Sequence, residues 1–299
     1  MSRIIALLCA LLPAACAHHT ALSPSSSPHY VLGAPYQAGG VWRYPQANYD
    51  AVETGLATVY QGVHPPLTTD GEAFDQTALA AAHPTLQLPA IARLTDLDSG
   101  RQITVRINDR GPATPHRLIE ITSRTAQLLG FPPSGVARVR LHVLSAESHA
   151  AADTLPGAPG LAIAAAPRTA VSEQPLTAPS GVGQDSASPE APLPRLESAA
   201  LLPAAPPLRL PETVTQTTPD PGSLWVQVGS FLGRRYAAMQ RTRLGALHLQ
   251  ILTGQTAGQQ EFRVRLGPFA TISEADAALD RAIAAGVPDA RIVVESDAE

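Results

Sequence analysis

Carboxyl, imidazole and amide side chains occur in three short segments in the first half of the chain. The segments are Thr69-Asp70-Gly71-Glu72, the stretch around His83, and Asn108-Asp109-Arg110-Gly111-Pro112. Asp109 ends a run of alternating polar and apolar residues and precedes a Gly-Pro turn, so we expect it at a strand end, facing a groove. A carboxyl group in such a place can act as a general acid when burial or a second carboxylate, such as Glu72, keeps it protonated.

Spacing alone leaves other interpretations of these residues open. The Asn-Asp-Arg-Gly-Pro segment is also typical of a turn whose aspartate caps backbone amides, and by pattern alone this is the more common case. A lone histidine such as His83 is more often a structural hydrogen-bonding residue than a catalyst. A metal site of His83, Glu72 and Asp109 would need ligands from scattered segments without a helical His-x-x-x-His spacing, so we expect no metal.

The composition excludes several kinds of catalytic and binding site. All 21 basic residues are arginine, so no lysine is available as a base or Schiff-base nucleophile. The net charge is −4, so the chain lacks the excess of basic residues that is typical of a nucleic-acid-binding protein. The only two cysteines, Cys9 and Cys16, exclude a disulfide framework and a cysteine-rich metal site.

Short strands around a single helix must position the three segments. The residue pattern predicts strands at 56–60, 91–96, 102–107 and 136–143, and a helix at 123–129 that ends at Gly130. Asp98-Ser99-Gly100, between the second and third of these strands, is typical of a hairpin turn. The pattern predicts a small, closed, mainly β barrel.

The C-terminal region has a different order of elements: strand, helix, strand, strand, helix, strand. The expected strands are 224–228, about 248–252, 261–266 and 291–295, and the expected helices are 234–244 and 273–285. Ser273 is the expected N-cap of the second helix, and Gly286 its end.

A proline-rich spacer separates the two regions. Residues 151–221 hold 14 of the 29 prolines and no aromatic residue, too little apolar surface to form a core. We therefore predict a disordered linker there. The expected division is a leader at 1–16, a tether at 17–50, the barrel at 51–146, the linker at 147–221 and an α+β domain at 222–298.

The first segment has the pattern of an export signal. A positive start precedes an apolar run at 4–12, which is too short to span a bilayer, and Ala14-Ala15-Cys16 follows. This end resembles a bacterial lipobox, although Pro13 stands where leucine is usual. The resemblance implies lipidation of Cys16, and Ala17 after it favours sorting to the outer membrane.

Residues 55–143 resemble the double-psi β-barrel domain of the rare lipoprotein A (RlpA) family. The matching motifs are Thr69-Asp70-Gly71-Glu72-Ala73-Phe74, Leu79-Ala80-Ala81-Ala82-His83-Pro84-Thr85-Leu86, Val105-Arg106-Ile107-Asn108-Asp109-Arg110-Gly111-Pro112 and Arg117-Leu118-Ile119-Glu120-Ile121-Thr122. The resemblance implies a six-stranded barrel and an endolytic transglycosylase, without a cofactor, that cuts peptidoglycan strands stripped of stem peptides (denuded strands) at the division septum.

The same resemblance assigns roles to residues. It places the catalytic aspartate on Asp109 and its supporting glutamate and histidine on Glu72 and His83. Asp109 would protonate the oxygen between N-acetylmuramic acid and N-acetylglucosamine, and then accept the proton of the sugar's 6-hydroxyl as a 1,6-anhydro ring closes. The substrate-binding residues expected in this domain are Thr69, Asn108 and Arg110.

The sequence departs from the family pattern beside these motifs. Val59 replaces a usual tryptophan, and Val63-His64-Pro65 stands in place of Phe-His-Gly. A tryptophan lost from a carbohydrate groove removes a stacking surface. An alternative function therefore stays open: a non-catalytic peptidoglycan-binding lipoprotein that tethers or recruits at the septum.

The C-terminal region resembles a SPOR (sporulation-related repeat) domain, a ferredoxin-like βαββαβ fold. The motifs are Trp225-Val226-Gln227-Val228-Gly229-Ser230-Phe231 and Phe262-Arg263-Val264-Arg265-Leu266-Gly267-Pro268-Phe269. The resemblance implies binding of denuded glycan by Gln227, Ser230, Phe231 and Arg265.

Together these features predict an outer-membrane lipoprotein that faces the periplasm at the septum. Peptidoglycan is its expected partner, with division proteins as possible further partners and no nucleic acid. We expect the SPOR domain to concentrate the barrel on glycan by tethering, with no need for contact between the two domains.

Overall fold

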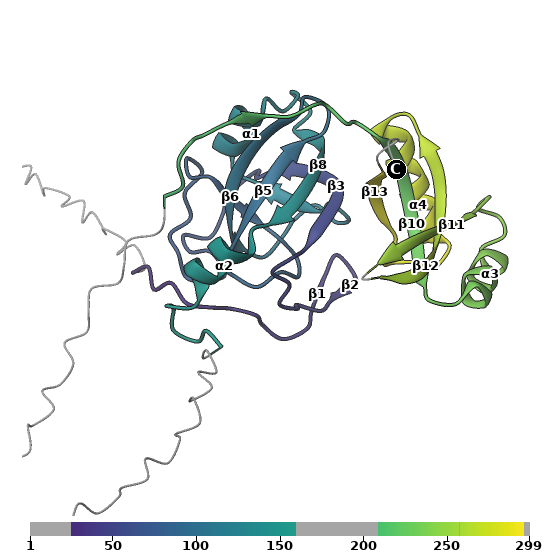
Figure 1. The fold of residues 1–299 in the computed structure, drawn as a ribbon, viewed down its shortest axis with the longest axis horizontal. Coiled ribbons are helices and arrows are strands. Elements are labelled where there is room, and N and C mark those ends of the chain that lie inside the picture. The colour runs from purple at the N-terminus through teal and green to yellow at the C-terminus, as the bar shows by residue number, and fades with distance from the viewer. Residues whose placement is uncertain (1–24, 160–208, 257, 296–299) are drawn as a thin grey trace, which may run out of the picture.

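The computed structural model describes residues 25–159, 209–256 and 258–295, which form two domains (Figure 1). Six strands make the first: β3 (Val52–Val59), β4 (Ala80–Ala82), β5 (Ala90–Asp96), β6 (Arg101–Asp109), β7 (Ile119–Ile121) and β8 (Val136–Val143). They follow the order β4-β7-β3-β8-β5-β6, and β6 pairs back onto β4. The sheet is therefore a closed barrel, which confirms the predicted fold class for this half.

The apolar residues that alternate with polar residues along β6 form part of the barrel core, as predicted from the sequence. Ile103, Val105 and Ile107 of β6 are fully buried inside the barrel. Helix α1 (Ser123–Leu129) begins after Thr122, whose side chain accepts from the Thr125 amide, and ends at Gly130 with φ 76°. These two caps fix the helix to the range that the sequence predicted.

Two barrel strands were not expected from the sequence. β4 and β7 have three residues each, and all six residues are buried. Strands this short and buried on both sides show no alternation, so their pattern is indistinguishable from a buried loop. Both position candidate site residues, because β4 leads directly to His83 and β7 carries Glu120.

Segments outside the predicted barrel range also pack onto it. The hairpin of β1 (Tyr36–Ala38) and β2 (Val41–Arg43) lies within the expected tether. Helix α2 (Ser145–Ala152) is tied to β5 by hydrogen bonds between Ser148 and the Ile91 backbone. Strand β9 (Thr215–Gln216) pairs with the start of β6 and so satisfies backbone groups at that edge. Both α2 and β9 fall largely in the range predicted to be linker.

The second domain has the predicted order of elements. Its bounds are β10 (Ser223–Phe231), α3 (Arg234–Arg243), β11 (Gln250–Thr256), β12 (Gln259–Phe269), α4 (Ile272–Ala284) and β13 (Arg291–Glu295). The antiparallel sheet runs β11-β12-β10-β13. The helix N-cap was wrongly predicted: Thr271, not Ser273, caps α4, because Thr271 and Glu274 form a reciprocal capping box.

The two domains touch, although tethering alone was expected to suffice. Thr54 Oγ1 lies 2.5 Å from the Val294 carbonyl oxygen, and the Arg117 guanidinium pairs with Asp276 at 2.6 Å. His116 Nδ1 lies 2.9 Å from the Ala290 carbonyl oxygen. Leu56 of the barrel also packs into the core of the second domain. The sheet of that domain is therefore held in a defined orientation against the barrel.

The leader, Cys16 and the middle of the predicted linker lie outside the described residues. Within the described part of the chain, no helix is long and apolar enough to cross a membrane.

Candidate functional site

Asp109, the last residue of β6, is half-exposed and has two differently placed carboxylate oxygens. Oδ1 accepts three hydrogen bonds, from the Thr69 amide at 2.9 Å, the Thr69 hydroxyl at 2.5 Å and the Arg110 amide at 2.8 Å. Oδ2 lies 3.5 Å from the Tyr60 hydroxyl. One oxygen is therefore fixed by three hydrogen bonds from the protein, and the other has a longer contact with the Tyr60 hydroxyl.

A second carboxyl group, that of Glu120, lies near Asp109. Glu120 is buried on β7 and accepts one hydrogen bond, from the Ala113 amide at 3.1 Å. Burial raises the pKa of Glu120, and the negative charge of Asp109 raises it further, while the Ala113 amide and His64 oppose the shift. Glu120 is a candidate site residue that was not predicted from the sequence. The available signal was an acid between two buried isoleucines, since a buried acid needs a partner or a function.

Three rings form an aromatic wall beside Asp109. The ring centroids of Tyr60 and Phe74 are 5.1 Å apart, and His64 lies 4.7 Å from Tyr60 and 4.5 Å from Phe74. Burial and the charge of Asp109 raise the pKa of Tyr60, so its hydroxyl stays protonated and can donate. These rings supply an aromatic surface although Val59 replaces the family tryptophan.

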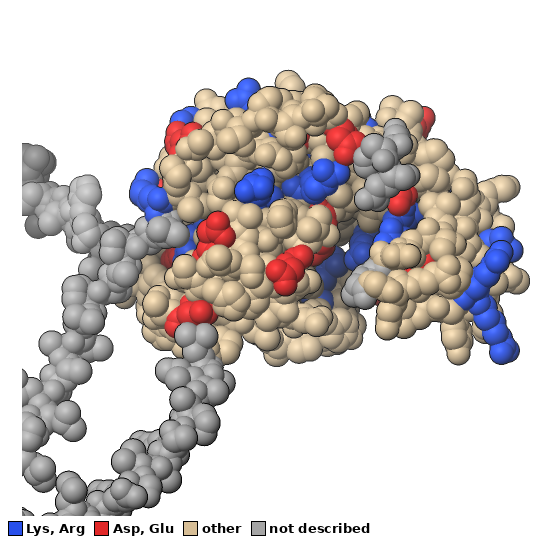
Figure 2. Space-filling view, in the orientation of Figure 1, with Lys and Arg blue, Asp and Glu red and all other residues tan. Residues whose placement is uncertain are grey.

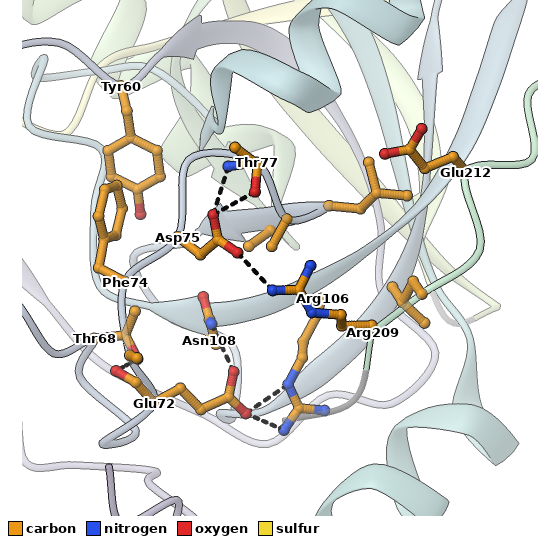
Figure 3. Close-up of a pocket in the computed structure, with 15 residues that line it drawn as sticks. Tyr60, Thr68, Glu72, Phe74, Asp75, Thr77, Arg106, Asn108, Arg209 and Glu212 are labelled. Carbon is orange, nitrogen blue, oxygen red and sulfur yellow. Dashed lines mark hydrogen bonds and ion pairs between the residues drawn. The ribbon is translucent and has the colours of Figure 1, made fainter. Parts of the chain in front are cut away.

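Glu72 belongs to a separate buried cluster (Figure 3). Its carboxylate accepts from Arg106 Nε at 2.7 Å and Nη2 at 2.5 Å, and from Asn108 Nδ2 at 2.8 Å. Both members of this ion pair are almost fully buried, next to a cavity of about 110 Å³. Glu72 therefore acts directly on Asn108, the residue before Asp109, rather than on the Asp109 carboxylate.

Asp70 lies next to Glu72 and is completely buried. Its Oδ1 accepts from the Thr68 hydroxyl at 2.7 Å. Burial, with a smaller contribution from the negative charge of Glu72, raises the pKa of Asp70 to about 7. Near neutral pH Asp70 is therefore only partly ionised.

His83 shares a backbone hydrogen bond with Asp109, but its side chain lies in a different place. The His83 amide donates to the Asp109 carbonyl at 3.0 Å. The ring is buried, and Nδ1 accepts from the amides of Thr85 and Leu86 at 3.3 and 3.2 Å. Burial lowers the pKa of His83 to about 4, so the ring is neutral and its proton is on Nε2. That nitrogen has no hydrogen-bond partner among the described residues and lies 3.9 Å from Glu53.

The three expected substrate-binding residues of the barrel have different surroundings. Thr69 contacts Asp109 directly, as described above, and Asn108 is bonded to Glu72. The Arg110 guanidinium donates to three carbonyl oxygens, of His83 at 3.3 Å, Leu86 at 2.5 Å and Leu32 at 2.8 Å. Arg110 thus ties the loop after β4 to the N-terminal segment.

The structure also brings the predicted groove residues of the second domain together. Gln227 accepts from Arg265 Nε at 3.1 Å and donates to the Ser230 hydroxyl at 2.8 Å, and Arg265 also pairs with Glu295. Gln227, Ser230 and Phe231 line a hollow of about 440 Å³. A second hollow of about 500 Å³, here called the interdomain cleft, lies between the sheet and the barrel and is lined by His83 as well as Gln227, Ser230 and Arg265.

Two family models match the chain, one over each domain. Residues 52–141 match the lytic transglycolase family, and residues 220–292 match the SPOR domain. The chain is 30% identical over 259 residues to endolytic peptidoglycan transglycosylase RlpA of Pseudomonas aeruginosa, a match that covers 84% of this chain and 72% of that protein. The chain belongs to the RlpA family.

Other RlpA relatives match a shorter part of the chain. RlpA of Campylobacter jejuni is 40% identical over 124 residues, which are 41% of this chain and 45% of that protein. A crystal structure of the RlpA SPOR domain from Pseudomonas aeruginosa covers 24% of this chain and 99% of its own length, at 25% identity and a TM-score of 0.22. The two family matches and the Pseudomonas aeruginosa relative confirm the predicted RlpA family and its pairing of a double-psi barrel with a SPOR domain.

Proposed function

We propose that this RlpA-family protein is an endolytic peptidoglycan transglycosylase, in which the barrel cleaves the β-1,4 bond between N-acetylmuramic acid and N-acetylglucosamine and the SPOR domain binds glycan. One observation carries the assignment of the reacting group. Asp109 presents one fixed oxygen and one oxygen turned to a wall of three rings, with a second carboxyl group nearby. Rings stack on sugar faces, and paired carboxyl groups are the usual means of glycosidic bond cleavage.

The reaction needs one acid–base group and no water. Protonated Asp109 donates its proton to the bridging oxygen as the bond from that oxygen to C1 of the muramic acid breaks. The 6-hydroxyl oxygen of the same sugar then bonds to C1, and its proton passes to the Asp109 carboxylate. The enzyme returns to its starting state, and the product ends in a 1,6-anhydro ring.

The other residues act around this group. The Tyr60 hydroxyl, which keeps its proton, donates toward Asp109 Oδ2 or a sugar oxygen. Glu120 places a second carboxyl group where positive charge develops on the sugar ring. Glu72 is a positioning residue, because it holds Asn108 and through it the end of β6. Thr69 orients Asp109, and we assign His83 to glycan binding, as argued below.

The decisive experiment is digestion of purified sacculi from which an amidase has removed the stem peptides. Mass spectrometry should find 1,6-anhydro glycans with the wild-type chain and none above background with Asp109→Asn, which keeps the shape of the side chain. Undiminished release by Asp109→Asn would refute the assignment. No release even by the wild-type chain, together with glycan binding, would instead favour the non-catalytic binding protein, an alternative that the loss of the family tryptophan at Val59 supports.

Placement in the cell is part of the proposal. We infer that the Cys16 thiol is lipidated and anchors the protein to the outer membrane, facing the periplasm at the division septum. Replacement of Cys16 by alanine should move the protein from the outer-membrane fraction to the soluble periplasmic fraction. Unchanged fractionation of this variant would argue against the lipid anchor.

A further inference from the structure

The interdomain cleft has the size and charge of a ligand site. Its volume of about 500 Å³ lies within the range of binding pockets for small organic molecules. Five arginines and three acids line it; Arg117, Arg263 and Arg265 are held in ion pairs, whereas Arg43 and Arg291 have no ion-pair partner among the described residues. Figure 2 shows arginine side chains on both sides of the hollow between the two domains. An anionic ligand rich in oxygen atoms fits this lining.

A buried donor on the barrel side of the cleft lacks a partner. His83 is 1% exposed, and its Nε2 carries the proton because the backbone amides occupy Nδ1. Of the described residues, none forms a hydrogen bond to this nitrogen. A buried N–H without an acceptor costs free energy, and an oxygen atom of a ligand in the cleft would remove that cost.

Arg43 is the second donor on the barrel side. It extends from β2, lines the cleft, and lies close enough to lower the pKa values of His83 and His116 by its positive charge. Within the described part of the chain it has no ion-pair partner. The Arg43 guanidinium and the His83 Nε2–H group can donate hydrogen bonds into the cleft but cannot accept them there. A carboxylate, which only accepts hydrogen bonds, therefore fits both groups.

The cleft continues into the groove of the SPOR sheet. Gln227, Ser230, Asp289 and Arg291 line both the interdomain cleft and the neighbouring hollow that contains Phe231. The two hollows therefore adjoin each other at the SPOR sheet and share four lining residues. A linear polymer is long enough to contact both hollows at once.

We propose that the interdomain cleft is a single glycan-binding site built by both domains, in which Arg43 and His83 of the barrel bind the free carboxylate of a muramic acid that has lost its stem peptide. This inference rests on the proposed function, since it takes peptidoglycan as the substrate. In a peptide-bearing strand the same carbon is part of a neutral amide with a bulky chain attached. The barrel residues of the site would thus distinguish strands without stem peptides from strands that carry them, while the SPOR residues bind the sugars.

Glu53 provides a charge of the opposite sign in the same place. Its carboxylate lies 3.9 Å from His83 Nε2, at the edge of the cleft, and would repel a ligand carboxylate. Neutralising Arg43 and neutralising Glu53 should therefore change affinity in opposite directions. This pair of variants separates a real electrostatic effect from a loss of folding, which only weakens binding.

The test uses the full chain carrying Asp109→Asn, so that the glycan is not consumed. Fluorescence anisotropy compares a labelled tetrasaccharide of peptidoglycan without stem peptides with the same tetrasaccharide bearing them. Arg43→Gln should weaken binding of the peptide-free glycan about tenfold and leave the peptide-bearing glycan nearly unchanged. Glu53→Gln should strengthen binding of the peptide-free glycan, and Arg93→Gln, an exposed arginine of β5 outside the cleft, should change neither.

Three results would overturn the inference. These are binding of both glycans by Arg43→Gln as tightly as by the parent, an equal loss of both by Arg43→Gln, and no tighter binding of the peptide-free glycan by Glu53→Gln. The proposed function is tested separately, by the release of anhydro glycans with the wild-type chain. That activity together with any of the three results would leave the function standing and remove only the shared site.

Discussion

Asp109 and His83 are joined by a backbone hydrogen bond, yet their side chains lie in two different regions of the barrel. Asp109 lies beside Tyr60 and the ring wall, whereas His83 faces the interdomain cleft. One region has a half-exposed carboxylate that can exchange protons, and the other has a buried, neutral donor. The motif groups Asp109 and His83 in one catalytic set, whereas the structure separates their side chains, which supports our proposal of cleavage at Asp109 and glycan binding at His83.

The largest expected effect is a loss of stability when the buried ion pair that supports the Asp109 region is broken. Glu72→Ala leaves Arg106 buried without its partner, and breaking a buried ion pair in this way costs about 3–5 kcal/mol of unfolding free energy. Denaturant unfolding followed by circular dichroism measures the loss. Glu212→Gln is the matched control, because it breaks an exposed pair with Arg124 and should leave the unfolding midpoint unchanged. Equal midpoints for wild type and Glu72→Ala would show that the pair is not a structural support.

A somewhat smaller effect belongs to His83 and depends on pH. The pKa of this ring is lowered from 6.5 to about 4, so as the pH falls from 6.5 toward 4 the unfolded chain takes up a proton that the folded chain does not. Stability contributed by the neutral ring is thus present above pH 6.5 and lost toward pH 4, by about 3 kcal/mol.

His83→Asn tests this pH dependence. Asparagine Oδ1 can still accept from the amides of Thr85 and Leu86, but the variant has no group that titrates in this range. Unfolding free energies at pH 4 and pH 7 should differ less in the variant than in the wild type.

The same His83→Asn variant should weaken glycan binding more than it lowers the rate of bond cleavage at saturating glycan. A fall in the maximal rate with unchanged affinity would place His83 with the reacting groups instead.

The smallest effect in this comparison is expected at Glu120. Glu120→Gln keeps the acceptor for the Ala113 amide but removes the carboxyl group beside Asp109. We expect the cleavage rate to fall about tenfold, as for loss of one electrostatic contribution, with a changed pH profile and unchanged glycan affinity. An unchanged pH profile would mean that Glu120 only supports the loop at Ala113.

Local signals in the sequence predicted much of the fold. The caps of α1, the alternation in β6 and the hairpin turn before Arg101 each depend on neighbouring residues, and each was found as predicted. The parts of the fold that were not predicted depend on contacts between residues that are far apart in the sequence. β4 and β7 are too short to show a period, and the contact of Thr54 with Val294 leaves no pattern in either segment.

The same distinction applies to the candidate site. The motif that ends β6 places Asp109 at a strand end before a Gly-Pro turn, as the alternation of the strand indicated. The direction of the His83 ring could not be predicted, because two amides of the following turn fix it after the strand has ended. Glu120 was missed because its neighbour Asp109 becomes close only when the barrel closes.

In the proposed reaction Asp109 alone transfers both protons, and no water enters the product. The sharpest test is digestion of stem-peptide-free sacculi in water enriched in oxygen-18, followed by mass spectrometry of the new glycan ends. Wild-type digestion should give 1,6-anhydro ends without the heavy isotope, and Asp109→Asn should give none of these ends. Labelled reducing ends, or anhydro ends released equally by Asp109→Asn, would contradict it.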